Sequence, residues 1–218
     1  MKLESCGILI SLRPFNERDC VARIFTRDHG ILVGMLRGAV VAKKNKPLVG
    51  QLGNVVWNAR LDSQLGIFHW EVEKNLSAQI IMIPDSLMAM NTAFGLIDLL
   101  LPERESYPGL YDETIDFVNG LKDTGLIKDC YLTWEINLLR ELGYALDLTR
   151  CSGCGKKDCL NYLSPRTGRA VCDTCAAPYI NKLYKLPLDL NTTLRFLDSV
   201  CVQQGVQIPV LRKILKIN

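Results

Sequence analysis

The sequence predicts a small β-barrel followed by a helical domain into which a metal-binding knuckle is inserted. Three observations carry this prediction. The first 80 residues contain short β-branched runs typical of strands, whereas apolar residues recur at helical spacing after Pro84. Five of the nine cysteines then fall within residues 151–175. We therefore expect two domains, residues 1–80 and 81–218, with the cysteine insert inside the second.

Five strands are predicted in the first domain, separated by turn residues. The last of them alternates Phe68, Trp70 and Val72 with polar side chains, the pattern of a half-buried strand. Five short strands within about 75 residues suit a closed barrel, of which the five-stranded oligonucleotide-binding (OB) barrel is the common example. The predicted strands cover residues 6–15, 19–26, 30–38, 51–61 and 66–74.

A basic loop is expected between the third and fourth strands. Residues 39–50, AVVAKKNKPLVG, contain three lysines and have no periodicity, so we expect an exposed, mobile loop. Residues 1–80 carry 11 Lys and Arg against 7 Asp and Glu, whereas residues 81–218 carry 15 against 16. A polyanion is therefore expected to meet the first domain.

Helices are expected after Pro84. Asp85 is predicted to be the N-cap of the first helix, which ends near Pro102, and Gly143 is predicted to end the third. The remaining predicted helices cover residues 110–121, 127–144, 189–205 and 209–217.

The cysteine insert has the spacing of a structural zinc site. Two C-x-x-C pairs are separated by 17 residues, and each pair points two sulfurs at one spot, so that together they form the tetrahedron that Zn²⁺ prefers. Residues 161–169 are expected to form a hairpin between the pairs, and Cys159 is left out because it has no partner at knuckle spacing. Four thiolates fill the coordination sphere, so the zinc is expected to be structural. The predicted ligands are Cys151, Cys154, Cys172 and Cys175.

Alternatives to zinc are reduced thiols without a metal and a redox-active C-x-x-C. The redox motif normally follows a strand and opens a helix, which neither pair clearly does in the sequence. The four scattered cysteines and the odd total favour a reducing cytosol over a disulfide framework. Neither a secretion signal nor a membrane span is expected.

Catalysis is not expected, since neither histidine lies in a catalytic motif and there is no phosphate-binding glycine loop. Binding of nucleic acid is compatible with the barrel, where basic residues are interleaved with aromatic ones. The simpler interpretation is that most of these aromatic side chains are barrel core. They are Phe15, Phe25, Trp57, Phe68 and Trp70.

Several stretches, in order, resemble the RecO family of bacterial DNA recombination and repair proteins. The opening strands GILISLRPFNERDCVARIFTRDHGILVGMLRGA, the helix and knuckle WEINLLRELGYALDLTRCSGCG, and the later CDTC carry the resemblance. It spans nearly the whole chain. Two departures are Val40, where many relatives have a basic residue, and the tail IPVLRKILKIN, which is only loosely similar.

The resemblance implies an N-terminal OB domain, a helical domain with a zinc insert, and no enzymatic activity. It implies binding of single- and double-stranded DNA, annealing of complementary strands and, with RecR, loading of RecA onto DNA covered by single-strand-binding protein. It also implies a cytoplasmic, nucleoid-associated protein. The expected DNA contacts are Arg13, Arg27, Arg37, Lys43, Lys44 and Lys46.

Two other hypotheses stay open. A protein–protein adaptor with a structural zinc site and no direct DNA contact is compatible with the net charge of +3. A zinc enzyme or redox switch would need a vacant or exchangeable ligand position, and only Cys159 favours it.

Overall fold

The structure is a computed structural model that describes residues 1–60, 65–144 and 146–217. The chain consists of two compact units, and each is described by itself. The first comprises Met1–Tyr131 together with Pro209–Asn218, and the second comprises Leu132–Ile208. Helices long and apolar enough to cross a membrane are absent from the described part of the chain.

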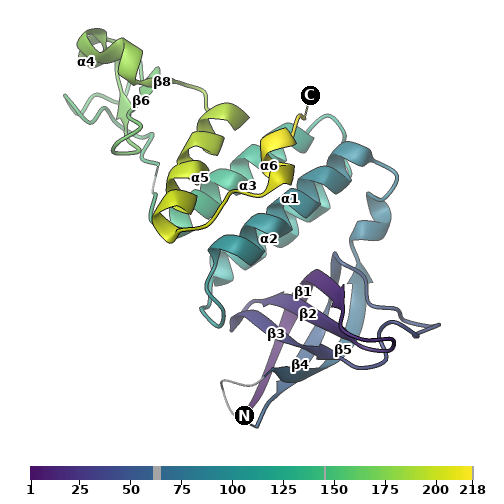
Figure 1. The fold of residues 1–218 in the computed structure, drawn as a ribbon. Helices are drawn as coiled ribbons and strands as arrows, with labels where there is room; N and C mark the ends of the chain where they lie inside the picture. Colours follow the sequence, from purple (N-terminus) through teal and green to yellow (C-terminus); the bar gives the residue numbers. More distant parts are fainter. Residues whose placement is uncertain (61–64, 145, 218) are drawn as a thin grey trace. The chain divides into compact units, whose positions relative to one another are not determined.

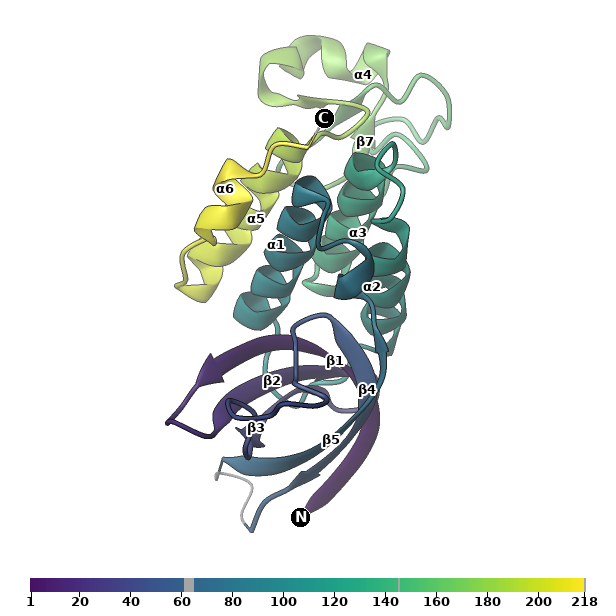
Figure 2. The same ribbon diagram turned by 90° about the vertical axis from the view of Figure 1, so that its right-hand side faces the viewer.

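Five strands of the first unit form a closed barrel in the order β1-β2-β3-β5-β4 (Figure 1). Neighbouring strands are antiparallel except for β3 and β5. The first half of β1 pairs with β4 and its second half with β2, so β1 curves around the barrel (Figure 2). The predicted fold class is confirmed. The strands are β1 (Lys2–Pro14), β2 (Cys20–Thr26), β3 (Gly30–Leu36), β4 (Gln51–Asn58) and β5 (Gly66–Asn75).

The barrel closes where two glycines meet. Gly34 of β3 pairs with Gly66 of β5 in the short parallel stretch. A Cβ atom on Gly66 would lie 2.0 Å from Nε1 of Trp57, and one on Gly34 would lie 2.9 Å from the carbonyl oxygen of Gly66. Trp57 is fully buried and donates its indole N–H to the carbonyl of Val33 at 2.8 Å. Glycine at both positions lets two strands approach the indole ring.

Alternate side chains of the strands form the core of the barrel. Each large apolar side chain that is fully removed from water stabilises the fold by about 1.5–3 kcal/mol. The buried core residues are Leu9, Cys20, Ala22, Ile24, Leu32, Leu36, Ala39, Val55, Trp57 and Phe68. Because Leu36 and Ala39 belong to this core, the basic loop leaves the barrel from a fixed point.

Helices follow the barrel after the short 3₁₀ turn η1 (Ser77–Gln79). The predicted cap of the first helix is wrong: α1 begins at Pro84, Ile83 is its N-cap, and Asp85 lies in the first turn. Proline at the first helical position holds the preceding residue extended, which makes Ile83 the N-cap, two residues before the predicted one. The helices of this unit are α1 (Pro84–Leu100), α2 (Pro108–Gly120), the start of α3 (Ile127–Glu141) and α6 (Val210–Ile214).

Contacts between the barrel and the helices hold the first unit together. The rings of Phe25 in β2 and Tyr111 in α2 meet edge to face with centroids 5.6 Å apart. Arg23 of β2 forms an ion pair with Asp98 of α1 and donates to Glu103 at 2.8 Å. These contacts explain why the barrel shares a unit with helices that the sequence assigned to a second domain. The predicted domains, 1–80 and 81–218, stay a prediction.

The second unit contains the cysteine insert and α5 (Leu190–Gln204). Asp189 caps α5 by accepting the amide N–H of Thr192 at 2.8 Å, and Gly205, with a φ of +68°, ends it. The insert holds a three-stranded sheet, order β7-β6-β8, in which β6 and β7 form the predicted hairpin. Its elements are β6 (Tyr162–Leu163), β7 (Ala170–Val171), α4 (Asp173–Ala176), η2 (Ala177–Lys182) and β8 (Tyr184–Lys185).

Candidate nucleic-acid interface and metal centre

The basic loop between β3 and β4 is anchored at both ends. The carbonyl of Arg18 accepts the N–H of Val40 at 3.0 Å, close to the start of the loop. Near its end, the side chain of the buried Gln51 accepts the N–H of Leu48 at 3.0 Å and donates to the carbonyl of Lys46 at 3.2 Å. Between these anchors the loop presents its charged side chains to solvent. The exposed ones are Lys43, Lys44 and Lys46, and Arg37, just before the first anchor, is exposed as well.

The carboxylate of Asp19 connects the turn between β1 and β2 to Gly38, just before the basic loop. Asp19 accepts the amide N–H of Gly38 at 2.8 Å and the side-chain N–H of Asn16 at 3.1 Å. The Gly38 amide, followed by the Asn16 side chain, lowers the pKa of Asp19. This hydrogen bond holds the turn close to the start of the basic loop. The exposed Arg13, at the end of β1, and Phe15, just after it, lead into this turn.

A pocket of about 330 Å³ lies between the basic loop and β5. Arg37 lines it from the loop side, and His69 and Trp70 line it from the strand. The indole N–H of Trp70 is buried and has no hydrogen-bond partner among the residues that the structure describes. This pocket therefore places a cation beside an aromatic residue.

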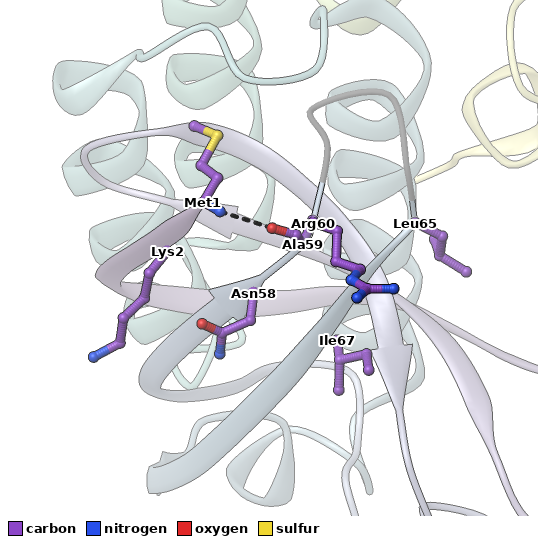
Figure 3. Close-up of a pocket in the computed structure, with 7 residues that line it drawn as sticks. All are labelled: Met1, Lys2, Asn58, Ala59, Arg60, Leu65 and Ile67. Atoms are coloured by element: carbon purple, nitrogen blue, oxygen red, sulfur yellow. Dashed lines mark hydrogen bonds between the residues drawn. The ribbon is translucent and has the colours of Figure 1, made fainter.

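A second pocket, of about 540 Å³, lies at the connection from β4 to β5. Figure 3 shows Arg60, Leu65 and Ile67 on one side of it and Lys2 on the other, with Asn58 between them. Ile67 lines both this pocket and the one beside Arg37, so the two pockets adjoin at β5, and together they are called the groove here. In OB barrels the connections between the first two and the last two strands are the usual binding loops.

Arg60 and Lys2 were not among the predicted contacts. Lys2 has an ion pair with Glu4, whereas Arg60 is exposed at the start of the β4–β5 connection. In the sequence Arg60 is one of several scattered arginines. Its position at the start of the β4–β5 connection, a usual binding loop of OB barrels, is the signal that could have identified it. Residues 61–64, which include the predicted end of the fourth strand at residue 61, lie outside the described residues.

Arg27 is engaged within the protein. Its guanidinium donates two hydrogen bonds, both 2.9 Å long, to the two carboxylate oxygens of Asp112 in α2. This hydrogen bond raises the pKa of Arg27 and lowers the pKa of Asp112. The structure therefore pairs the exposed Arg27 with a carboxylate of the same unit, whereas Arg37 and Arg60 are exposed beside the pockets.

The interleaved aromatic side chains divide into two classes. Trp57 is fully buried and Phe68 is 6% exposed, and both belong to the barrel core, as the simpler interpretation expected. Phe25 is also fully buried, but its ring packs against Tyr111 of α2. Phe15 is 61% exposed, and Trp70 is half-buried. Only the last two are accessible for stacking on a base.

The four cysteines of the two C-x-x-C pairs lie together in the second unit. All four Sγ atoms lie within 4.8 Å of one another, and those of Cys154 and Cys172 are 3.6 Å apart. A tetrahedral zinc with Zn–S bonds of about 2.3 Å places its sulfurs about 3.8 Å apart. The residues present therefore fit a four-thiolate metal ion with no open position. Cys159 is exposed, and its thiol is not part of the cluster.

Backbone hydrogen bonds prepare these sulfurs for a cation. The amides of Cys172 and Gly153 each donate to Sγ of Cys151 at 3.3 Å. The Cys172 amide is the main cause that lowers the pKa of the Cys151 thiol to about 6. The Cys175 thiol instead donates to the other sulfurs, to Cys154 first, which raises its pKa to about 12. A bound cation would remove this asymmetry by favouring all four thiolates.

One expectation about the C-x-x-C pairs is wrong. Cys172 follows β7 directly and is the N-cap of α4, so the second pair does come after a strand and before a helix. The helix has only four residues, however, and the pair faces the sulfurs of Cys151 and Cys154. This arrangement favours metal ligation over an isolated redox pair.

The distribution of charge along the chain differs from what the two predicted domains suggest. Residues 81–146 carry 4 Lys and Arg against 11 Asp and Glu, whereas residues 147–185 carry 7 against 3. A count over residues 81–218 hides this contrast, because the acidic helices cancel the basic insert. The insert is therefore a second basic region, separate in sequence from the barrel.

Comparison with known proteins places both parts of the chain in one family. Family models described as "Recombination protein O N terminal" and "Recombination protein O C terminal" match residues 1–73 and 84–215. The chain is 37% identical to the DNA repair protein RecO of Dinoroseobacter shibae over 83% of this chain and 76% of that one. It is 33% identical to the DNA repair protein RecO of Bartonella henselae over 94% of this chain and 80% of that one. The chain therefore belongs to the RecO family of DNA repair proteins.

Proposed function

We propose that this protein is a DNA-binding recombination mediator that binds and anneals DNA without catalysing a reaction. Together with RecR, it would assist the loading of RecA onto DNA covered by single-strand-binding protein. The observation that carries DNA binding is the groove across β5, which runs from Lys2 and Arg60 to Arg37 beside the basic loop. We further propose that the protein works in the bacterial cytoplasm, in association with the nucleoid, and contacts both single- and double-stranded DNA.

In this proposal phosphates are bound by exposed cations, and bases stack on Phe15 or Trp70. Phosphate contacts carry no sequence information, so binding should show little sequence preference. Arg27 should contribute least of the predicted contacts, because a phosphate would have to displace Asp112. The proposed contacts are Arg13, Arg27, Arg37, Lys43, Lys44 and Lys46, joined by Lys2 and Arg60.

The metal ion is proposed to be zinc. Four clustered thiols, with two backbone amides donating to one of them, match the donor set that a structural zinc prefers. Its role would be to hold the two knuckles together, and the chemistry it supplies is limited to that cross-link.

The second candidate function is an adaptor that binds proteins and does not touch DNA. The acidic helical segment, residues 81–146, favours it locally, since an excess of 11 carboxylates over 4 cations disfavours contact with a polyanion. We propose that this segment contributes a protein-docking surface within the mediator.

A salt series tests the proposal. Fluorescence anisotropy of a labelled single-stranded oligonucleotide should give a log–log slope of about −0.7 per phosphate contacted. The triple variant K43E/K44E/K46E should bind more weakly and lower the slope by about 2. The control K122E/K128E/K213E makes the same change in net charge at exposed lysines away from the groove. Equal losses in both variants would reject the loop assignment, and no binding by the wild type at low salt would leave the adaptor.

A further inference from the structure

A pocket of about 520 Å³ lies in the cysteine insert, entirely within the second unit. The two knuckles contribute Gly153 and Cys175 to it, and the turn of the β6–β7 hairpin contributes Pro165 and Arg166. The segment η2 and the residue after it complete the wall with Tyr179, Lys182 and Leu183. Because the knuckles form part of the wall, the shape of the pocket would depend on the proposed metal cross-link.

The lining of this pocket is mostly apolar, and two cationic side chains, Arg166 and Lys182, lie at its edge. Val171 is buried and Leu183 half-buried, whereas the Tyr179 side chain is 59% exposed. An exposed aromatic ring beside an apolar pocket offers a stacking surface that is not used by the protein's own core.

Two cations stand at this border. Arg166 and Lys182 are exposed, and neither forms an ion pair with any residue that the structure describes. Other arginines and lysines of the insert strengthen the field, so that residues 147–185 carry 7 cations against 3 carboxylates. Four thiolates with a divalent metal would contribute a charge of about −2 and leave the insert positive.

We propose that this pocket is a second binding site for single-stranded nucleic acid, separate from the barrel groove. A base stacks on Tyr179 and enters the apolar pocket, while Arg166 and Lys182 hold the flanking phosphates. Each nucleotide presents a flat ring next to one negative charge, which is the combination that this lining complements. The inference rests on the proposed DNA binding and extends it to a second site in the cysteine insert.

Variants of the pocket test this inference on the whole protein, with a labelled oligothymidine as the probe. R166E/K182E should bind about tenfold more weakly and lower the salt slope by about 1.4, the value for two phosphates. Y179A should bind about tenfold more weakly, whereas Y179F, which keeps the ring, should bind like the wild type. The control K156E/K157E makes the same charge change at exposed lysines that do not line the pocket. Bound metal per chain confirms that each variant keeps its insert.

The outcomes separate this inference from the function on which it rests. If R166E/K182E and Y179A bind like the wild type while K43E/K44E/K46E does not, the second site is rejected and the barrel site stands. Equal weakening by K156E/K157E and R166E/K182E would mean a general charge effect and would also reject it. If a labelled polyglutamate peptide competes for the Tyr179 site better than oligothymidine, the occupant is an acidic peptide and the nucleic-acid assignment falls. Absence of binding by the wild type overturns both proposals.

Discussion

The barrel and the cysteine insert are stabilised in different ways, although one chain forms both. Among the described residues of the barrel, ten buried ones form one continuous apolar cluster around Trp57. The buried cluster of the insert has four residues, and two of them are Cys151 and Cys172, which belong to the proposed metal site. An apolar core of this size does not hold a fold by itself, and the proposed metal cross-link would take its place. If the proposal holds, the insert depends on a ligand to fold, whereas the barrel has an apolar core of its own.

Removing the metal should have the largest effect, and it should be confined to the insert. Structural zinc in small peptides is bound with about 10–16 kcal/mol, which is an upper guide for this site. Cys172→Ala or a chelator should therefore unfold the insert and leave the barrel intact. Hydrogen exchange measured by mass spectrometry checks this, with Cys159→Ser as the control. Equal loss of protection in β1–β5 would contradict the separation of the two parts.

The matching change in the barrel is Gly66→Val. The new side chain would enter the space of the Trp57 indole, since its Cβ atom alone would lie 2.0 Å from Nε1, and should cost about 3 kcal/mol or more. Thermal melting measures the loss, while the metal content of the insert should stay unchanged. Gly95→Ala is the control, because nothing lies within 4 Å of a Cβ there and alanine favours the interior of α1. A small effect of Gly66→Val would show that the barrel closes differently.

A smaller effect is expected at the start of α5, in the second unit. Asp189→Ala removes the cap on the amide of Thr192 and should cost about 1 kcal/mol. The bond to Thr192 lowers the pKa of Asp189, so its stabilisation is present above the unfolded pKa and lost as the pH falls through the folded one. Denaturant unfolding at neutral and at acidic pH tests both points. Asp198→Ala, at an exposed position inside the same helix, should have little effect.

The smallest effect is expected from the Arg27–Asp112 pair on the surface of the first unit. Both side chains are about half exposed, so water and salt screen their interaction. Asp112→Asn should lower the melting temperature only slightly, and the difference should vanish as the pH falls through the lowered pKa of Asp112. The same variant frees Arg27, so DNA affinity should rise if Arg27 is a phosphate contact. Unchanged affinity would remove Arg27 from the proposed interface.

The sequence predicted the elements better than the contacts between them. Strands and the knuckle hairpin follow from local patterns, and the metal cluster follows from the spacing of its cysteines, so all of these were found. Pairing of Arg27 with Asp112 joins positions 85 residues apart, which no local pattern records. That two pockets share Ile67 depends on how β5 meets the loop after β3, which no local pattern records either. The basic insert was missed because the charge was averaged over both the insert and the acidic helices.

The two hydrogen bonds made by the Gln51 side chain, to Leu48 and Lys46, limit the number of conformations open to the basic loop. With Val40 and Leu48 fixed, only the short arch between them is free to rearrange. A short arch has few conformations to lose, so ordering it on a ligand costs less entropy than closing the whole connection from β3 to β4. The lysines of the loop are therefore held near their binding positions before a ligand arrives. Binding of a polyanion, as proposed, would not require the whole loop to become ordered first.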